Sequence, residues 1–238
     1  MELFAKREYY VGNEALSKGV ICSLSYPIEN GIINNLWDME CIWSHIFTNE
    51  LKIDPCEHNI LFTEPISNPK SNREKIAFEM FETFNVLGLY IATSGILCTY
   101  SIGKFTSLCI DIGDGVTQIL PILNGYLSNS YVRLDLGGRD LTEYMIKELL
   151  PEIGIRFKYS CEKTIANKIK EIACYVPIDY DKEGKNIKPY DYELPDGNHI
   201  ILDEQRIKCP ELERVNEFKS LFSISNCNNV KILVLEIL

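Results

Sequence analysis

The sequence predicts an α/β protein with two units. Apolar segments of strand length alternate along the chain with segments whose apolar residues recur at three- and four-residue spacing, as on one face of a helix. The chain has 238 residues, 46% of them hydrophobic, which is enough to bury one large core or two modest ones. Because the pattern changes near residues 103–107, we place the boundary between the units there.

The first unit is expected to begin with a strand face, because apolar residues alternate over 22–28. An apolar stripe over 39–51 predicts a helix that ends before Asp54-Pro55. The rest of the unit reads as strand, helix, strand and helix, and this order favours a covered sheet. These four elements are predicted at residues 59–63, 76–84, 87–93 and 94–101.

The second unit is expected to begin with three strands, at residues 108–112, 116–123 and 131–136. Apolar stripes then predict helices over 141–149 and 165–176, the second ended by Pro177. The polar segment 181–191 is expected to be a mobile loop, and residues 195–197 a turn. We expect 199–202 to pair with 206–209 as a hairpin. The apolar end, 230–238, would need a partner surface.

Composition excludes several classes of protein. The net charge of −10, from 24 Lys+Arg against 34 Asp+Glu, makes the chain a poor general binder of nucleic acid or anionic membrane. Residues 85–103 carry no charge, but their serines, threonines and glycine favour a buried strand and helix over a membrane span. Nine cysteines without a CxxC pair, and three scattered histidines, favour reduced thiols in a cytosolic protein over a zinc site.

The segment 110–117 carries the clearest chemistry. Two predicted strands are joined by Gly113-Asp114-Gly115-Val116, a turn whose glycines let a ligand approach the backbone. Successive N–H groups in such a turn can bind an anion, and Asp111 at the strand end could hold the water shell of Mg²⁺. The alternative is a plain hairpin in which Asp-Gly supplies the turn geometry.

A second candidate is Gly137-Gly138, which follows a predicted strand and opens a helix. The N–H groups at such a helix start favour anions. The alternative is an ordinary strand-to-helix turn in which Asp140 caps the helix.

Many segments, in order from about residue 9 to residue 211, resemble the actin family. The match covers most of the chain. In this sequence the segments are YVGNEA (10–15), YPIENGI (26–32), NEL (49–51), TEP (63–65), NPK (68–70), NREK (72–75), MFETFN (80–85), GDGVT (113–117), RLDL (133–136), GRDLT (138–142), IKE (169–171), CYV (174–176) and YELPDG (192–197).

The resemblance implies the actin and Hsp70-type ATPase fold, in which two ribonuclease H-like α/β halves hold ATP or ADP with Mg²⁺ between two phosphate hairpins. It also implies a cytoplasmic, cytoskeletal protein that assembles into filaments with itself or actin and meets actin-binding proteins. Residues 1–106 would be part of the first lobe and 107–238 part of the second. The second would comprise the hairpin region 107–136, a helical lobe 137–211 and an unmatched tail 212–238.

By position, the resemblance assigns nucleotide-binding roles to a small set of residues. Gly113, Asp114, Gly115 and Val116 would form the second phosphate hairpin, and Asp111 would reach Mg²⁺ through water. Gly138 would line the nucleotide cleft, and Lys170 and Glu171 would flank the adenosine.

Departures from the family pattern are equally specific. Ser94 stands where the family has the glutamine that orients the attacking water, and Gln118 where it has the partner histidine. The chain is expected to begin inside the small outer lobe, without the first phosphate hairpin. We therefore assign no catalytic residue and expect weakened ATP binding and little hydrolysis, since a water-positioning group contributes roughly 10²–10⁴-fold. Without the family's opening strands, the strands at 59–63 and 87–93 would expose an edge and an apolar face.

Three other functions are weighed against an actin-like filament protein. A sugar kinase of the same broad fold would need both phosphate hairpins and a catalytic carboxylate, and the actin-specific segments remote from the cleft count against it. The other two are a non-polymerising remnant that binds actin, and a nonfunctional partial gene product.

Overall fold

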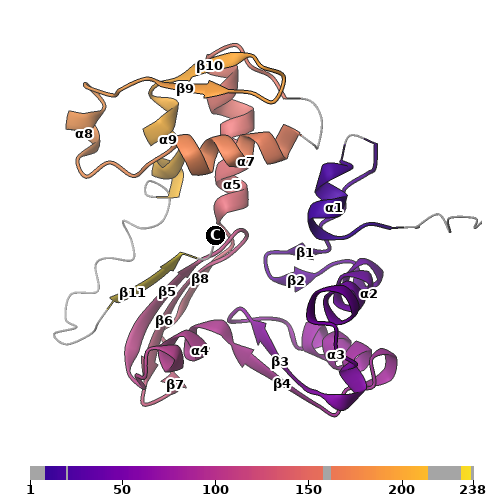
Figure 1. Cartoon of the computed structure of the whole chain (residues 1–238). Helices are drawn as coiled ribbons and strands as arrows, with labels where there is room; N and C mark the ends of the chain where they lie inside the picture. The colour runs from indigo at the N-terminus through magenta and orange to yellow at the C-terminus, as the bar shows by residue number, and fades with distance from the viewer. Residues whose placement is uncertain (1–8, 20, 158–161, 214–231, 237–238) are drawn as a thin grey trace, which may run out of the picture. The chain divides into compact units, whose positions relative to one another are not determined.

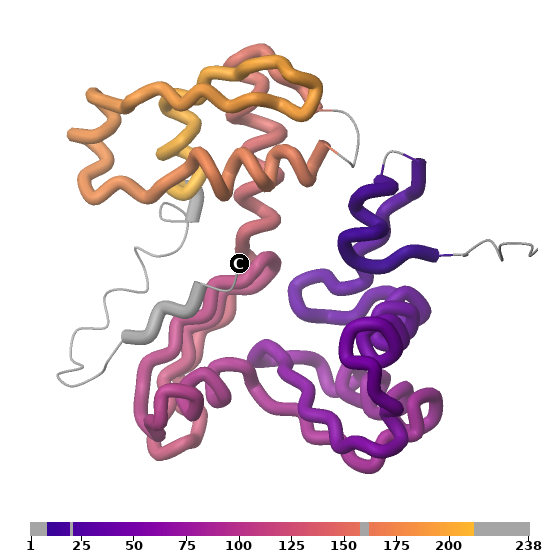
Figure 2. Tube along the Cα trace, viewed as in Figure 1, coloured from indigo at the N-terminus to yellow at the C-terminus, as the bar shows by residue number. Residues whose placement is uncertain are grey.

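The computed structural model describes residues 9–19, 21–157, 162–213 and 232–236. The chain divides into two compact units, residues 1–105 with 122–129, and residues 106–121 with 130–238. Figures 1 and 2 follow the chain through them. The change of unit after Phe105 lies inside the segment where the sequence pattern changes, and a short return of the chain adds residues 122–129 to the first unit.

The first unit starts with α1 (Gly12–Ser17) and the short strands β1 (Ile28–Glu29) and β2 (Ile32–Ile33). These strands pair antiparallel around Asn30-Gly31, where φ is 47° and 73°, as a tight hairpin turn requires. The strand predicted over 22–28 is wrong except for Ile28. The ladder contains only two residue pairs, and residues 22–27 alternate in sequence without lying in a strand.

The predicted helix at 39–51 is confirmed as α2 (Leu36–His45) continued by the π-helical turn η1 (Ile46–Leu51). After the short helix η2 (Pro55–Glu57), the strand, helix, strand and helix predicted next are all present. They are β3 (Asn59–Glu64), α3 (Lys70–Phe78) with η3 (Glu79–Thr83), β4 (Gly88–Thr93) and α4 (Ser94–Ser101). β3 and β4 run parallel in register, as a helical crossover requires.

One face of the β3–β4 sheet packs on the core of the first unit. Ile60, Phe62, Leu89 and Ile91 contact a buried cluster of Ile33, Met39, Trp43, Phe47, Ile76, Met80 and Val86. The Trp43 ring meets the Phe62 ring edge-on, with 5.6 Å between their centroids.

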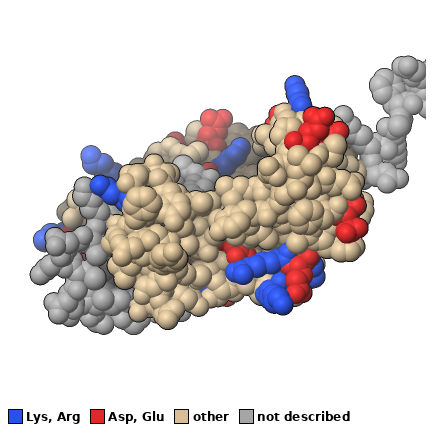
Figure 3. Space-filling model, turned by 90° about the horizontal axis from the view of Figure 1, so that it is seen from below, with Lys and Arg blue, Asp and Glu red and all other residues tan. Residues whose placement is uncertain are grey.

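The other face of this sheet is open. Leu61 and Tyr90 lie directly opposite each other in the ladder and are 58% and 69% exposed. Such an exposed apolar face is expected of strands that lack the family's opening strands beside them. On the face of the molecule seen in Figure 3, charged side chains are also sparse.

The second unit contains most of a five-stranded sheet. Its strands are β5 (Ser107–Ile112), β6 (Thr117–Leu123), β7 (Tyr126–Leu127), β8 (Val132–Leu134) and β11 (Ile232–Glu236). The order is β11-β5-β6-β7, with β8 also paired to β6. The apolar end of the chain therefore meets a partner surface: the backbone of β11 pairs parallel with β5, Ile232 opposite Leu108.

The helical part of this unit surrounds a second core, and in Figure 1 its helices α5, α7 and α9 lie against β9 and β10. The core consists of Met145, Leu149, Leu150, Ala166, Ile169, Ala173, Ile200, Leu202 and Cys209. The elements are α5 (Gly138–Tyr144), η4 (Met145–Leu149), α6 (Leu150–Glu152), α7 (Glu162–Ala173), α8 (Tyr180–Glu183), β9 (Tyr190–Glu193), β10 (His199–Leu202) and α9 (Gln205–Glu213).

Three predictions in this part need correction. The hairpin of 199–202 with 206–209 is wrong, because β10 pairs antiparallel with β9 across the predicted turn at 195–197, and 205–213 is helix α9. A short apolar run does not distinguish strand from buried helix. The loop expected at 181–191 contains most of α8, capped by Asp179, and the start of β9. α7 ends at Ala173, before Pro177.

Candidate functional site

The turn between β5 and β6 has the geometry of an anion-binding hairpin. Gly113 N donates to Val116 O at 2.9 Å and closes the turn. None of the described residues accepts a hydrogen bond from the amides of Asp114, Gly115 or Val116. Three successive amides in a tight turn can converge on one negatively charged group.

The start of α5 is clamped onto this hairpin. Gly138 N donates to Gly113 O at 3.0 Å, and Arg139 N donates to Asp114 O at 2.8 Å. A Cβ on Gly137 would lie 2.5 Å from Gly113 O, so only glycine fits at this approach. The amides of Gly138 and Arg139, at the start of the helix, therefore donate to carbonyls of the hairpin. The expectation that the N–H groups at this helix start bind an anion is wrong for these two amides.

The helix cap that the sequence offers as the alternative at this turn is present. The Asp140 carboxylate accepts a hydrogen bond from Gly137 N at 2.8 Å. It thereby pairs a backbone donor that the start of the helix leaves without an intrahelical acceptor.

Lys170 of α7 reaches the same turn. Its ammonium donates to Gly138 O at 2.8 Å and to the Thr142 hydroxyl at 3.1 Å. Glu171 is exposed and is linked to the group through Asn167, whose amide donates to Glu171 Oε1 at 2.5 Å. Asn167 Oδ1 in turn lies 3.1 Å from the Thr142 hydroxyl. The structure therefore places Lys170 in direct contact with Gly138. Glu171 is connected to the same group through Asn167 and Thr142.

Asp111 and Gln118 form a buried pair at the base of the hairpin. Gln118 Nε2 donates to Asp111 Oδ2 at 2.9 Å. Gln118 is only 4% exposed and Asp111 only 6%. A buried carboxylate needs such donors, because it has lost its hydration. Gln118 therefore fixes the position of Asp111.

Ser94 belongs to the first unit. It is the first residue of α4, directly after β4, and is half-buried. The remaining predicted site residues, Asp111 to Val116, Gly138, Lys170 and Glu171, belong to the second unit.

Sequence reasoning missed one residue of this arrangement, Thr142, and one contact, that of Gly137 with the hairpin. Thr142 connects Gly138, Lys170 and Asn167 through its hydroxyl. Its position four residues after Gly138, on the same helical face, is the signal that could have identified it. The close packing of Gly137 against the hairpin depends on a contact between distant segments, and no local pattern reveals it.

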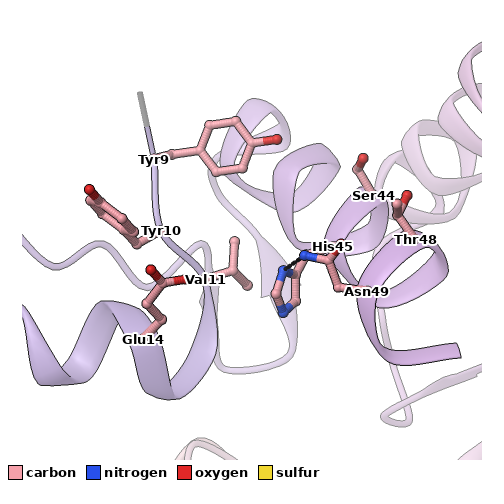
Figure 4. A pocket seen from close by; sticks show the side chains of 8 residues that line it. All are labelled: Tyr9, Tyr10, Val11, Glu14, Ser44, His45, Thr48 and Asn49. Atoms are coloured by element: carbon pink, nitrogen blue, oxygen red, sulfur yellow. Dashed lines mark hydrogen bonds between the residues drawn. The ribbon is translucent and has the colours of Figure 1, made fainter. Parts of the chain in front are cut away.

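A half-open pocket of about 330 Å³ lies in the first unit and shares no residue with the hairpin group. Figure 4 shows its lining side chains, which come from the segment leading into α1, from α1 itself, and from α2 and η1. They are Tyr9, Tyr10, Val11, Glu14, Ser44, His45, Thr48 and Asn49.

These observations define a mixed α/β protein in which a glycine-containing strand hairpin is locked against a strand-to-helix turn. The model of the family described as Actin matches residues 2–226. The chain therefore belongs to the actin family, and the matched residues extend past Glu211, where the resemblance seen in the sequence fades. Within the described residues, no helix is long and apolar enough to cross a membrane.

Proposed function

We propose that this chain is an actin-like cytoskeletal protein that binds ATP or ADP with Mg²⁺ weakly and hydrolyses ATP little or not at all. One observation carries the nucleotide part of the proposal. Three hairpin amides that donate to none of the described residues belong to the same network of contacts as the Lys170 ammonium. Membership of the actin family supports the cytoskeletal part.

The residues present fit a bound phosphate. The amides of Asp114, Gly115 and Val116 would hold phosphate oxygens. Lys170 adds a positive charge, and its ammonium has three donors, of which two are used by Gly138 and Thr142. When bound, Mg²⁺ supplies neutralisation of phosphate charge, and Asp111, held by Gln118, would meet its water shell. Glu171, with Lys170, would flank the adenosine.

Hydrolysis is expected to be weak because the water-positioning residues differ from the family pattern. Ser94 has a short side chain where a glutamine is expected, and Gln118 is committed to the Asp111 carboxylate. No residue is therefore assigned the task of orienting the attacking water.

The proposed partners are further copies of this chain or actin in filaments, and actin-binding proteins, in the cytoplasm. The alternative is a non-polymerising remnant that binds actin and limits its assembly. The exposed Leu61–Tyr90 face favours this alternative, since it offers a surface that another chain could cover. A nonfunctional partial gene product would show neither activity.

Nucleotide binding is tested by the thermal unfolding of the purified chain with and without millimolar Mg-ATP. A ligand that binds only the folded state stabilises it by about 2.7 kcal/mol at a hundredfold excess over Kd. We expect the unfolding temperature to rise, and Lys170→Met to abolish the rise. Lys168→Met, an exposed lysine on the same helix, is the control and should keep it. A wild-type transition unmoved by Mg-ATP would contradict nucleotide binding.

The lost hydrolysis is tested by restoring the family residues. We expect the double variant Ser94→Gln with Gln118→His to release phosphate from ATP faster than the wild type. Ser94→Ala with Gln118→His is the matched control and should not. If the wild type already hydrolyses ATP as fast as the double variant, the proposed loss of turnover is wrong.

Assembly is tested by co-sedimentation with intact actin. Enrichment of the chain in the pellet supports incorporation into filaments, and a fall in total polymer supports the capping alternative. The absence of both effects contradicts both functions.

A further inference from the structure

The pocket of the first unit has a lining that is rich in hydrogen-bond acceptors. Asn49 Nδ2 lies 2.8 Å from His45 Nδ1, so the amide donates and the ring nitrogen accepts (Figure 4). The proton of the neutral ring is then on Nε2, which lies 3.3 Å from Glu50 Oε1. This arrangement leaves the Asn49 carbonyl oxygen as an acceptor. Within the part of the chain that is described, it has no partner.

Further oxygen atoms line the same pocket. The hydroxyls of Ser44 and Thr48 make no side-chain hydrogen bond with any described residue. Ser44 and Thr48 are four residues apart along α2 and η1, and Figure 4 shows their side chains near each other. Across the pocket, Glu14 of α1 supplies a carboxylate. The ionised acid and the oxygen acceptors together favour a ligand that carries a positive charge and several donors.

Two residues that line this pocket already hold one cation of the chain itself. The Lys18 ammonium lies 3.4 Å from the centroid of the Tyr10 ring and 3.0 Å from Glu14 Oε1. Lys18 is not among the residues that line the pocket. The combination of an aromatic face and a carboxylate that holds this ammonium is the one that recognises alkylammonium and guanidinium groups.

We propose that this pocket binds a basic side chain, arginine above lysine, of a partner polypeptide. A guanidinium presents five donors in one plane, stacks on aromatic rings and pairs with carboxylates, which suits Tyr9, Tyr10 and Glu14. The half-open pocket of about 330 Å³ is at the small end of binding pockets, large enough for one long side chain entering from a neighbouring chain. The net charge of −10 favours encounter with a basic partner. This site is separate from the proposed nucleotide site.

The test uses nine-residue Gly-Ser peptides with one central arginine, lysine or citrulline, titrated into the ¹⁵N-labelled full chain. Citrulline keeps the shape of arginine without its charge. We expect saturable amide shift changes at Ser44, Thr48 and Asn49 with the arginine peptide, and at least tenfold weaker binding of the citrulline peptide. Equal binding of the two peptides, or no saturable change up to ten millimolar peptide, overturns the proposal.

Two substitutions should change the affinity in opposite directions. Glu14→Gln should weaken binding of the arginine peptide about tenfold, whereas Glu82→Gln, the same charge change on η3, should alter it less than twofold. Lys18→Met should strengthen binding several-fold, because the internal cation that shares Glu14 is removed. Lys75→Met on α3 is its control. If Glu14→Gln acts no more strongly than Glu82→Gln in folded protein, the pocket does not recognise the cation.

Discussion

At the residue scale, Gly137 shows how one missing side chain sets the geometry of the hairpin group. Its φ of −166° is available to any residue, so the requirement for glycine is steric. A Cβ there would lie 2.5 Å from Gly113 O and 2.6 Å from Asp114 O, both backbone atoms that cannot move aside. The contact holds the hairpin at a fixed distance from α5.

We expect Gly137→Ala to lower the free energy of unfolding by about 1–3 kcal/mol, the usual cost of overpacking. Gly138→Ala is the matched variant, because its Cβ would meet Lys170 Nζ, the flexible end of a side chain, at 3.2 Å. It should cost less than about 1 kcal/mol. Urea unfolding of both variants measures the difference, and equal losses would contradict the steric explanation.

At the element scale, Glu143 joins α5 to α7. Its carboxylate lies 2.9 Å from Lys147 on η4 and 2.9 Å from Lys163 on α7. Hydrogen bonds from Lys147 and then Lys163 lower the pKa of Glu143 from 4.5 to about 2. Because the pKa of Glu143 is lower in the folded state than in the unfolded chain, its ionised carboxylate stabilises the fold at pH values above 4.5. This contribution is lost as the pH falls from 4.5 towards 2.

We therefore expect Glu143→Gln to destabilise the protein at pH 7 and to have progressively less effect below pH 4.5. The Glu143 side chain is 39% exposed, so solvent screens the pairs and the cost at neutral pH should be about 0.5 kcal/mol. Urea unfolding at pH 7 and at low pH measures it. Glu148→Gln, a change at an exposed residue of η4, is the control and should cost less than Glu143→Gln at pH 7.

The two faces of the β3–β4 sheet contribute differently to the stability of the first unit. Phe62 packs on the core of the first unit, whereas Leu61 and Tyr90 are exposed. In the double variant Leu61→Thr with Tyr90→Thr, we expect each substitution to change the free energy of unfolding by less than about 0.5 kcal/mol, as surface substitutions do. The same change should reduce self-association, because it removes an exposed apolar strand pair. Sedimentation velocity measures the association.

The matched variant on the inner face is Phe62→Ala. It should cost about 3 kcal/mol, since it removes a large side chain that packs on the core. If the outward double variant destabilises the protein as much as Phe62→Ala, then that face is covered within the chain.

At the scale of the whole molecule, the two units have separate cores, one around Met80 and one around Leu149. We expect Met80→Ala and Leu149→Ala to cost about 2–5 kcal/mol each in the unit they occupy, because both side chains are fully buried. Native-state hydrogen exchange resolves the location. Met80→Ala should lower protection mainly in β3 and β4, and Leu149→Ala mainly in α7 and β10. Uniform loss across both units would show that they unfold as one.

Much of the architecture could be predicted from the sequence because it depends on local chemistry. The spacing of apolar side chains predicts the helix that ends at Leu51 and the strands β3 and β4. The turn residues predict the turn at 195–197. The quoted motifs indicate the actin family, which the family match shows. The segment from Asp111 to Thr117 forms a hairpin because two apolar runs flank a glycine-containing turn.

Tertiary structure alone decided which segments meet. The run 205–213 became a helix and β9 became the partner of β10, since pairing between distant residues depends on the packing of the whole unit. The same applies to Gly137 against Gly113, to Thr142 beside Lys170, and to the pocket between Glu14 and Asn49. Local sequence determines what a segment can form. The free energy of burying it against another segment determines what it does form, and that depends on contacts far apart in the chain.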